Sequence, residues 1–197
     1  MAGTEAGRWR DLGAYRARGL PGWVALAEGL DRMVTGIESP VGTARGLAAR
    51  LRYLTASDAG YEAMDRAGIH VRPRTLIAWL AEEQTPSKAN LARLDAAYWQ
   101  LRRRNTVPDL KRRLNNRGRG TRIEIDPVDQ SQVERRHQRD LQTRSINVRG
   151  GVWDRAVDAW IDGNTDELDA IWDEIISSGL GTDWDAYTHV SSVGWAA

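Results

Sequence analysis

Short runs of helical periodicity, each ended by turn-forming residues, constrain the fold of this chain more than any other feature. Apolar residues recur every three or four positions in four runs between residues 42 and 105, and in another run at residues 23–37. This spacing is typical of amphipathic helices. Residues suited to helix starts precede or open the four runs: Thr43, Ser57, Pro73 and Ser87. The first half of the chain is therefore predicted to be a bundle of short helices.

The pattern changes in the last third of the chain. Residues 121–125 (TRIEI) and 144–148 (RSINV) alternate between polar and apolar types, as half-buried strands do. Helical spacing returns at residues 152–161 and 166–179, and residues 188–195 form a third strand candidate. The fold class expected is mostly α, with an N-terminal helix–turn–helix bundle followed by a small C-terminal α+β module of order β-β-α-α-β.

These patterns divide the chain into four expected segments. Residues 1–25 interleave arginine with aromatic residues and are expected to form an N-terminal arm, before a DNA-binding domain at 26–105. Residues 106–122 contain two glycines and are expected to be a flexible basic linker, and residues 123–197 are expected to be an acidic α+β domain. Within that domain, the polar stretch between the first two strands is expected to be a mobile connection or a weak helix.

The net charge of +1 conceals a strong polarity along the chain. Residues 41–122 carry 17 basic and 7 acidic side chains, a balance of +10, whereas residues 150–197 carry 1 and 10, a balance of −9. Such asymmetry indicates a nucleic-acid-binding segment followed by an acidic segment with another role. An alternative is that the acidic segment folds back onto the basic one and inhibits binding.

The composition excludes several classes of site. The chain has no cysteine, so disulfides and thiolate metal sites are excluded. Its three histidines are far apart in the sequence, which leaves few ligands for the zinc ion of a hydrolase. No nucleotide-binding or nucleophile motif is present, and we attribute the carboxylates of residues 154–173 to a solvated acidic face. We therefore expect no cofactor, no metal and no catalytic residue. The lack of long apolar stretches predicts a cytoplasmic protein without a membrane partner, and the expected DNA binding makes it nucleoid-associated.

A helix–turn–helix candidate covers residues 58–84. In such motifs the second helix enters the major groove with its N-terminus first. We expect Leu76, Ile77 and Leu80 to form the buried stripe of this helix, and four residues to contact bases: Arg72, Arg74, Thr75 and Ala78. The alternative is a helical hairpin within an unrelated bundle.

Basic side chains elsewhere are candidates for phosphate contacts, because acidic residues are nearly absent around them. The alternative is a solvated charged face. The candidates are Arg45, Lys88, Arg102, Arg103, Arg104, Lys111, Arg112, Arg113, Arg117 and Arg119. We assign a different role, core or interface packing, to the C-terminal tryptophans, because their neighbours are acidic: Trp153, Trp160, Trp172, Trp184 and Trp195.

Several collinear stretches between residues 26 and 197 carry a family resemblance: GLDRMV, GLAARLRYL, DRAGI, RTLIAWL, NLARLDAAYW, TRIEID, RSINV and NTDELDAIWDEIISSGLG. The chain resembles the telomere-associated terminal proteins of actinobacterial linear chromosomes and plasmids. The resemblance implies an N-terminal DNA-binding half, a distinct C-terminal half, and action at replicon ends. It also implies that a protein hydroxyl carries a DNA 5′ end and primes synthesis. A telomere-binding protein and a DNA polymerase are the partners that the family implies.

The resemblance departs from the family pattern at the nucleotide-bearing threonine. That residue lies between the two strands, where this chain has His137 and Gln138, which carry no hydroxyl. The nearest candidate acceptors are Thr143 and Ser131. Either the acceptor has moved, or this chain has kept DNA binding and lost priming.

Two functions follow from these observations. The first is a DNA-binding protein of replicon ends, with at most a covalent nucleotide acceptor in place of an enzyme active site. The alternative is a helix–turn–helix transcriptional, replication or partition regulator of a plasmid, phage or integrative element. In either case DNA is the expected partner, and the C-terminal segment is a candidate surface for homodimer formation.

Overall fold

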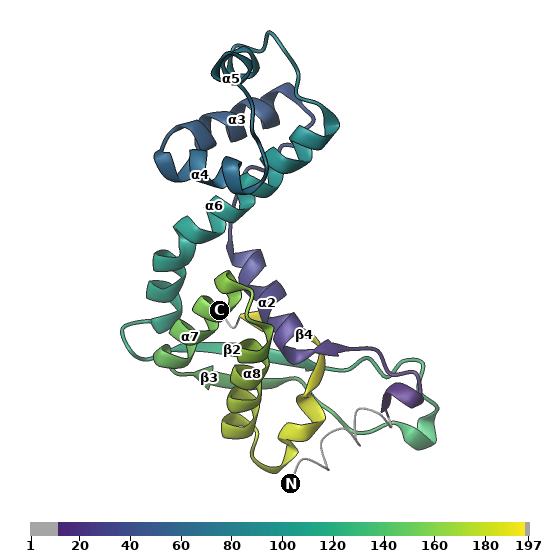
Figure 1. Ribbon diagram of the computed structural model, residues 1–197. Helices are drawn as coiled ribbons and strands as arrows, with labels where there is room; N and C mark the ends of the chain where they lie inside the picture. Colours follow the sequence, from purple (N-terminus) through teal and green to yellow (C-terminus); the bar gives the residue numbers. More distant parts are fainter. Residues whose placement is uncertain (1–11, 196–197) are drawn as a thin grey trace. The chain divides into compact units, whose positions relative to one another are not determined.

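The computed structural model describes residues 12–195, and the chain divides into two compact units (Figure 1). Among these residues, unit 1 comprises 12–33 and 107–195, and unit 2 comprises 34–106. The described chain is mostly helical and contains a four-stranded antiparallel sheet. The unit boundaries differ from those expected, because residues 26–33 and 107–122 belong with the sheet and not with the helical unit.

Unit 2 is a helical bundle in which three of the four helices begin at a capping hydroxyl. Its elements are α3 (Ala44–Thr55), α4 (Asp58–Arg66), α5 (Pro73–Leu80) and the first part of α6 (Lys88–Asn115). The Thr43 hydroxyl accepts a hydrogen bond from the Gly46 amide at 3.1 Å, which confirms the predicted N-cap of α3. The Ser57 and Ser87 hydroxyls accept amide hydrogen bonds at 3.3 Å at the starts of α4 and α6. These three hydroxyls satisfy amides that have no partner inside their helices.

Apolar side chains from all four helices form the core of unit 2. The core residues share near-complete burial, and all but Trp79 come from the apolar faces of the helices or the turn after α4: Leu51, Leu54, Ala63, Met64, Ile69, Trp79, Leu94, Ala97, Tyr98 and Leu101. Burial of these side chains holds α3, α4 and α5, which are too short to be stable alone, against the longer α6.

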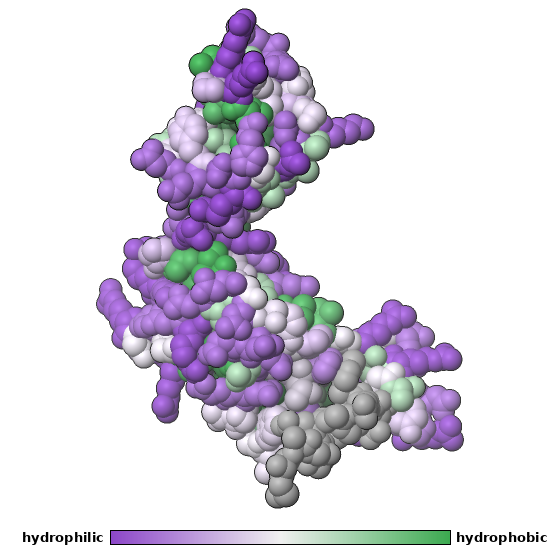
Figure 2. Space-filling view, in the orientation of Figure 1, coloured by the Kyte–Doolittle hydropathy of each residue, from purple (hydrophilic) through white to green (hydrophobic). Residues whose placement is uncertain are grey.

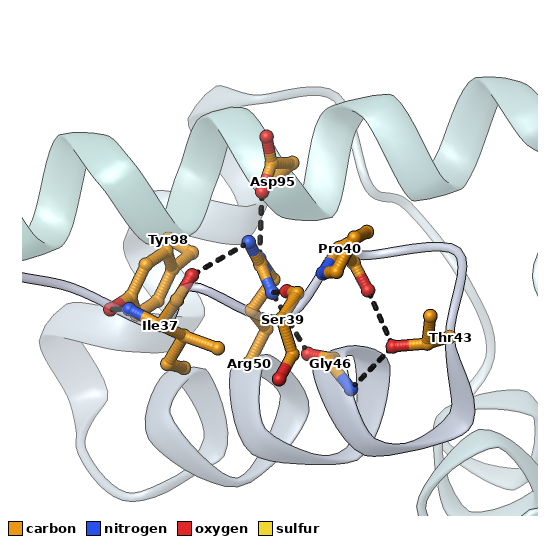
Figure 3. A network of polar contacts seen from close by, with 8 residues as sticks. All are labelled: Ile37, Ser39, Pro40, Thr43, Gly46, Arg50, Asp95 and Tyr98. Carbon is orange, nitrogen blue, oxygen red and sulfur yellow. Dashed lines mark hydrogen bonds and ion pairs between the residues drawn. The ribbon is translucent and has the colours of Figure 1, made fainter.

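Arg50 is the charged side chain at the centre of unit 2, with only 4% of its surface exposed. It lies outside the apolar stripe of Leu47, Leu51 and Leu54 on α3, and its side chain is buried all the same. Its guanidinium donates hydrogen bonds to the carboxylate of Asp95 on α6 at 2.7 Å, and to the carbonyl oxygens of Ser39 at 2.7 Å and Gly46 at 3.1 Å (Figure 3). The guanidinium carbon also lies 5.2 Å from the centre of the Tyr98 ring. These contacts compensate for the cost of burying the charge.

Unit 1 is built on the antiparallel sheet, whose strand order is β1-β4-β2-β3. The strands are β1 (Leu20–Pro21), β2 (Thr121–Pro127), β3 (Arg144–Val148) and β4 (His189–Trp195). Side chains alternate along β2, so that Ile123 and Ile125 are buried while Arg122 and Glu124 are exposed. The alternation in the sequence therefore reflects one covered and one solvent-facing side of the sheet.

Three helices lie over the covered face of the sheet (Figure 1). They are α2 (Gly22–Met33), α7 (Gly150–Asp162) and α8 (Thr165–Gly179), and a 3₁₀ segment, η2 (Gly181–Tyr187), leads from α8 to β4. Trp153, Trp160 and Trp172 are buried beneath them, which confirms core packing for these three tryptophans. The Trp172 indole donates to the carbonyl of Tyr187 at 3.1 Å. A side chain at Gly22 would come within 1.9 Å of that indole, so only glycine allows α2 to begin there.

The expected basic linker is wrong over its first half. Residues 106–115 are helical and continue α6, although Asn105 and Pro108 predicted that the helix would end. Pro108 is exposed, whereas Leu110 and Leu114 are almost completely buried in unit 1. Burial of these two leucines favours continued helix strongly enough to accommodate a proline that removes one backbone donor.

The expected N-terminal arm and the polar stretch between β2 and β3 pack against each other. Leu12 and Ala17 form a small core with Val128 and Val133, and an isolated bridge pairs Arg18 with Asp129. The polar stretch contains one short 3₁₀ turn, η1 (Arg135–His137). Residues 12–25 are thus part of unit 1, and the rest of the predicted arm, residues 1–11, lies outside the described residues.

Replacing Arg50 with methionine is expected to destabilise unit 2 by about 3 kcal/mol, because it removes one partner of a buried ion pair and leaves backbone carbonyls without donors. Hydrogen exchange of α3 amides in the full chain measures this loss. The matched control is Arg52→Met on the same helix, where the side chain is exposed. A control variant that loses as much protection as Arg50→Met would show that the buried network is unimportant.

Candidate nucleic-acid interface

Helix α5 is held in place at both ends by backbone geometry. Before it, Gly68 has a φ of +78°, and the Ile69 amide donates to the Met64 carbonyl at 2.9 Å, which closes α4 and turns the chain. After it, Glu82 has a φ of +60°, and the Glu83 amide donates to the Ala78 carbonyl at 2.9 Å. The middle of α5 is fixed by Trp79, which is 3% exposed in the core.

The exposed face of α5 differs from the one expected. Thr75 and Ala78 are only partly exposed, so the predicted base-contacting pair does not lie at the centre of the solvent face. Ile77 is instead 63% exposed and Leu80 38% exposed, although the sequence predicts both in the buried stripe. Trp79 occupies the core side of this helix in their place. Figure 2 shows hydrophobic residues at the surface of the end of unit 2 that carries α5, with hydrophilic residues around them.

Arg72 and Arg74 stand at the start of α5, and both are exposed. Within residues 12–195, neither side chain makes an ion pair or a hydrogen bond. The helix itself contains no acidic residue. The two guanidinium groups are therefore available to donate hydrogen bonds to a bound molecule, and the acceptor atoms of guanine and of phosphate match their geometry.

The other predicted phosphate contacts in unit 2 occupy three places. Arg45 and Lys88 are exposed in the first turns of α3 and α6. Arg102, Arg103 and Arg104 lie further along α6, where the Arg102 Nε donates to the carbonyl of Thr35 at 2.7 Å.

Sequence reasoning missed Arg93. It is exposed on α6, and its Nε lies 3.7 Å from the position that a Cβ would take at Gly68, in the turn between α4 and α5. No periodicity along the chain brings these two residues together, so the sequence carried no signal for this cation.

The remaining predicted phosphate contacts belong to unit 1, and acidic side chains already pair with several of them. Lys111 Nζ lies 2.6 Å from a carboxylate oxygen of Asp158 on α7. Arg112 and Arg113 both pair with Asp109 on the same helix. Arg117 and Arg119 follow in the turn after α6. The expected basic segment is therefore split between the units, and part of it faces the acidic C-terminal helices.

The two candidate nucleotide acceptors each hydrogen-bond to a carboxylate. The exposed Thr143 hydroxyl donates to Asp126 at 2.8 Å, and Ser192 on β4 donates to the other oxygen of the same carboxylate at 2.7 Å. The Ser131 hydroxyl lies 3.1 Å from Asp129. The Ser131 amide and hydroxyl together lower the pKa of Asp129 below its ordinary value.

The two positions that align with the family threonine have structural contacts of their own. The His137 ring stacks on the Tyr15 ring, with centroids 3.8 Å apart and the planes 6° from parallel. The Gln138 side chain donates to the carbonyl of Val133 at 2.8 Å. His137 therefore contacts an N-terminal residue, whereas Gln138 holds the segment between β2 and β3 in its own conformation.

No family model, curated protein or solved structure matches this chain. In residues 12–195, no helix is both long and apolar enough to cross a bilayer. The same residues contain no group of three or more histidine, aspartate or glutamate side chains placed to hold a metal ion.

Replacing Glu82 with glycine is expected to raise the unfolding free energy of unit 2 by about 0.5–1 kcal/mol, because glycine adopts the left-handed conformation at the end of α5 without steric cost. Urea unfolding of the full chain measures the change. The control, Glu83→Gly, alters the next residue, whose φ is not positive, and is expected to give no gain. Equal effects of the two variants would contradict the assignment of strain to residue 82.

Proposed function

We propose that unit 2 binds double-stranded DNA through α5, with α4 and α5 acting as a helix–turn–helix. The observation that carries the proposal is a pair of exposed arginines, Arg72 and Arg74, at the start of an acid-free helix, neither of them paired with any residue between 12 and 195. The opposite side of that helix is anchored by Trp79, so its solvent face is presented rigidly. A helix presented in this way can enter the major groove N-terminus first, where arginine forks match the O6 and N7 acceptors of guanine.

The division of charge between the units supports this assignment. Residues 34–106 carry 11 basic and 7 acidic side chains, so that 11 − 7 gives +4 for unit 2. The described residues of unit 1 carry 15 basic and 18 acidic side chains, so that 15 − 18 gives −3 for unit 1. A polyanion is therefore attracted to unit 2 and repelled overall by unit 1.

The geometry at Thr143 favours a second role, that of a nucleotide acceptor at replicon ends. Its exposed hydroxyl donates to the Asp126 carboxylate, which can accept the proton when the threonine oxygen attacks the α-phosphate of a deoxynucleoside triphosphate. The products are a phosphodiester to the protein and pyrophosphate. This role requires a DNA polymerase to supply the catalytic site.

The alternative is a regulator that binds DNA without priming. The structural roles of His137 and Gln138, at the positions where the family carries its threonine, favour this alternative. Both functions use the same DNA-binding unit, and they differ only in the chemistry of unit 1.

The DNA-binding proposal predicts that Arg74→Ala weakens binding to a preferred duplex by about 1–3 kcal/mol. Arg74→Lys keeps the charge but loses the two-pronged contact with guanine, so it should lose sequence preference while retaining affinity for unrelated duplexes. Gel retardation at several salt concentrations, with duplexes selected from a random pool, measures both effects. Unaltered sequence preference in the Arg74→Lys variant would contradict base reading by this residue.

The priming role predicts that radiolabel from a deoxynucleoside triphosphate stays on the protein through a denaturing gel, after incubation with template and DNA polymerase. Thr143→Val removes only the hydroxyl and should abolish labelling, whereas Ser131→Ala should not change it. Labelling that persists in Thr143→Val would reject Thr143 as the acceptor. An unlabelled wild-type protein that still retards DNA would identify the regulator instead.

A further inference from the structure

Ile77 is the most exposed large apolar side chain among residues 12–195. Its exposed fraction of 63% exceeds the 47% of Tyr61 on α4 and the 38% of Leu80 on its own helix. Single exposed apolar residues are common on protein surfaces, but this one lies at the centre of the helix face proposed to meet DNA.

The face is defined by helical geometry. At about 100° per residue, Pro73, Ile77 and Leu80 form one stripe along α5, with Arg74 on its edge. Arg74 and Ile77 are three residues apart, which is about 4.5 Å along the helix axis, comparable with the roughly 3.4 Å rise of one base pair. One helix can therefore hold the arginine and the isoleucine over neighbouring base pairs.

We propose that Ile77 determines specificity by packing against the 5-methyl group of thymine in the major groove. This inference rests on the proposed DNA-binding function of α5. Thymine is the only common DNA base that presents a methyl group there, so an aliphatic side chain distinguishes it from cytosine without a hydrogen bond. The α5 face then selects guanine through arginine and thymine through isoleucine.

The surroundings of Ile77 favour DNA over a protein partner. Arg72, at the N-cap, and Arg74, in the first turn, precede it, and both are unpaired within the described residues. The stripe offers only Ile77 and Leu80 as large apolar side chains, whereas a stable protein interface takes about 20–30 residues from each side. Acidic residues border the neighbouring groove between α4 and α5, where Glu62 and Asp65 lie beside Tyr61. Charge complementarity to a polyanion therefore favours the α5 face over this neighbouring groove.

The test compares thymine with uracil, which differs only by that methyl group. The full-length protein is used to select duplexes by gel retardation from a synthetic pool with a random central segment. The selected pool is then amplified with either dTTP or dUTP, and the affinity for each product is measured. Loss of one buried methyl group is expected to weaken binding about fourfold, so the wild-type protein should favour the thymine pool by at least that factor.

The variants separate the methyl contact from general affinity. Ile77→Ala should bring the thymine-to-uracil ratio close to one. Arg74→Ala should weaken binding to both pools and keep the ratio, and Tyr61→Ala, which removes an exposed apolar side chain from α4, should change neither. Circular dichroism of each variant checks that it is folded, which is expected because all three side chains are exposed.

The outcomes distinguish this inference from the function on which it rests. Equal wild-type affinity for the two pools, or an unchanged ratio in Ile77→Ala, overturns methyl reading while DNA binding stands. A wild-type dimer that dissociates in Ile77→Ala, seen by sedimentation velocity, would assign the residue to a protein interface and also overturn the inference. Failure to retard either pool at low salt overturns the DNA-binding function and the methyl contact together.

Discussion

The fold of unit 2 depends on one buried cation. The Arg50 guanidinium joins α3 to the Asp95 carboxylate on α6 and to the carbonyls of the chain segment that enters the unit, including those of Ile37 and Ser39 (Figure 3). That segment is neither helix nor strand, so its carbonyls have no regular backbone partners. A single planar group with five donors satisfies several of them at once, which lets an irregular segment pack beside the apolar core.

This arrangement leaves α5 free to carry the proposed function. Trp79 and the hydrogen-bonded turns before and after α5 fix the position of this helix. Its outer residues are therefore not needed for packing in the core. The outer face then combines arginine guanidinium groups with an aliphatic side chain, and both kinds of group can contact the edges of bases. Unit 1 carries the opposite net charge, and its acidic α7 already pairs with Lys111. Attraction for a polyanion is thus concentrated in the smaller unit and opposed in the larger one.

Features governed by neighbouring residues were predictable from the sequence. The caps at Thr43 and Ser57 were predicted and are confirmed, because capping involves residues only three positions apart. The strands at residues 121–125 and 144–148 were also predicted, because polar and apolar residues alternate where one side of a strand is buried and the other is exposed. The exposed face of α5 was predicted less well. Leu76, Ile77, Trp79 and Leu80 are all apolar, and the spacing does not say which of them faces the core.

The sequence by itself determined the helix starts, the strands, the separation of charge along the chain and the exclusion of cysteine chemistry. The tertiary structure alone decided that Arg50 is buried, that α6 continues past Pro108, and that residues 12–33 belong with the sheet. Each of these outcomes depends on partners distant along the chain, such as Asp95 for Arg50. Local propensity is worth only tenths of a kcal/mol per residue, so burial of a few large side chains overrides it.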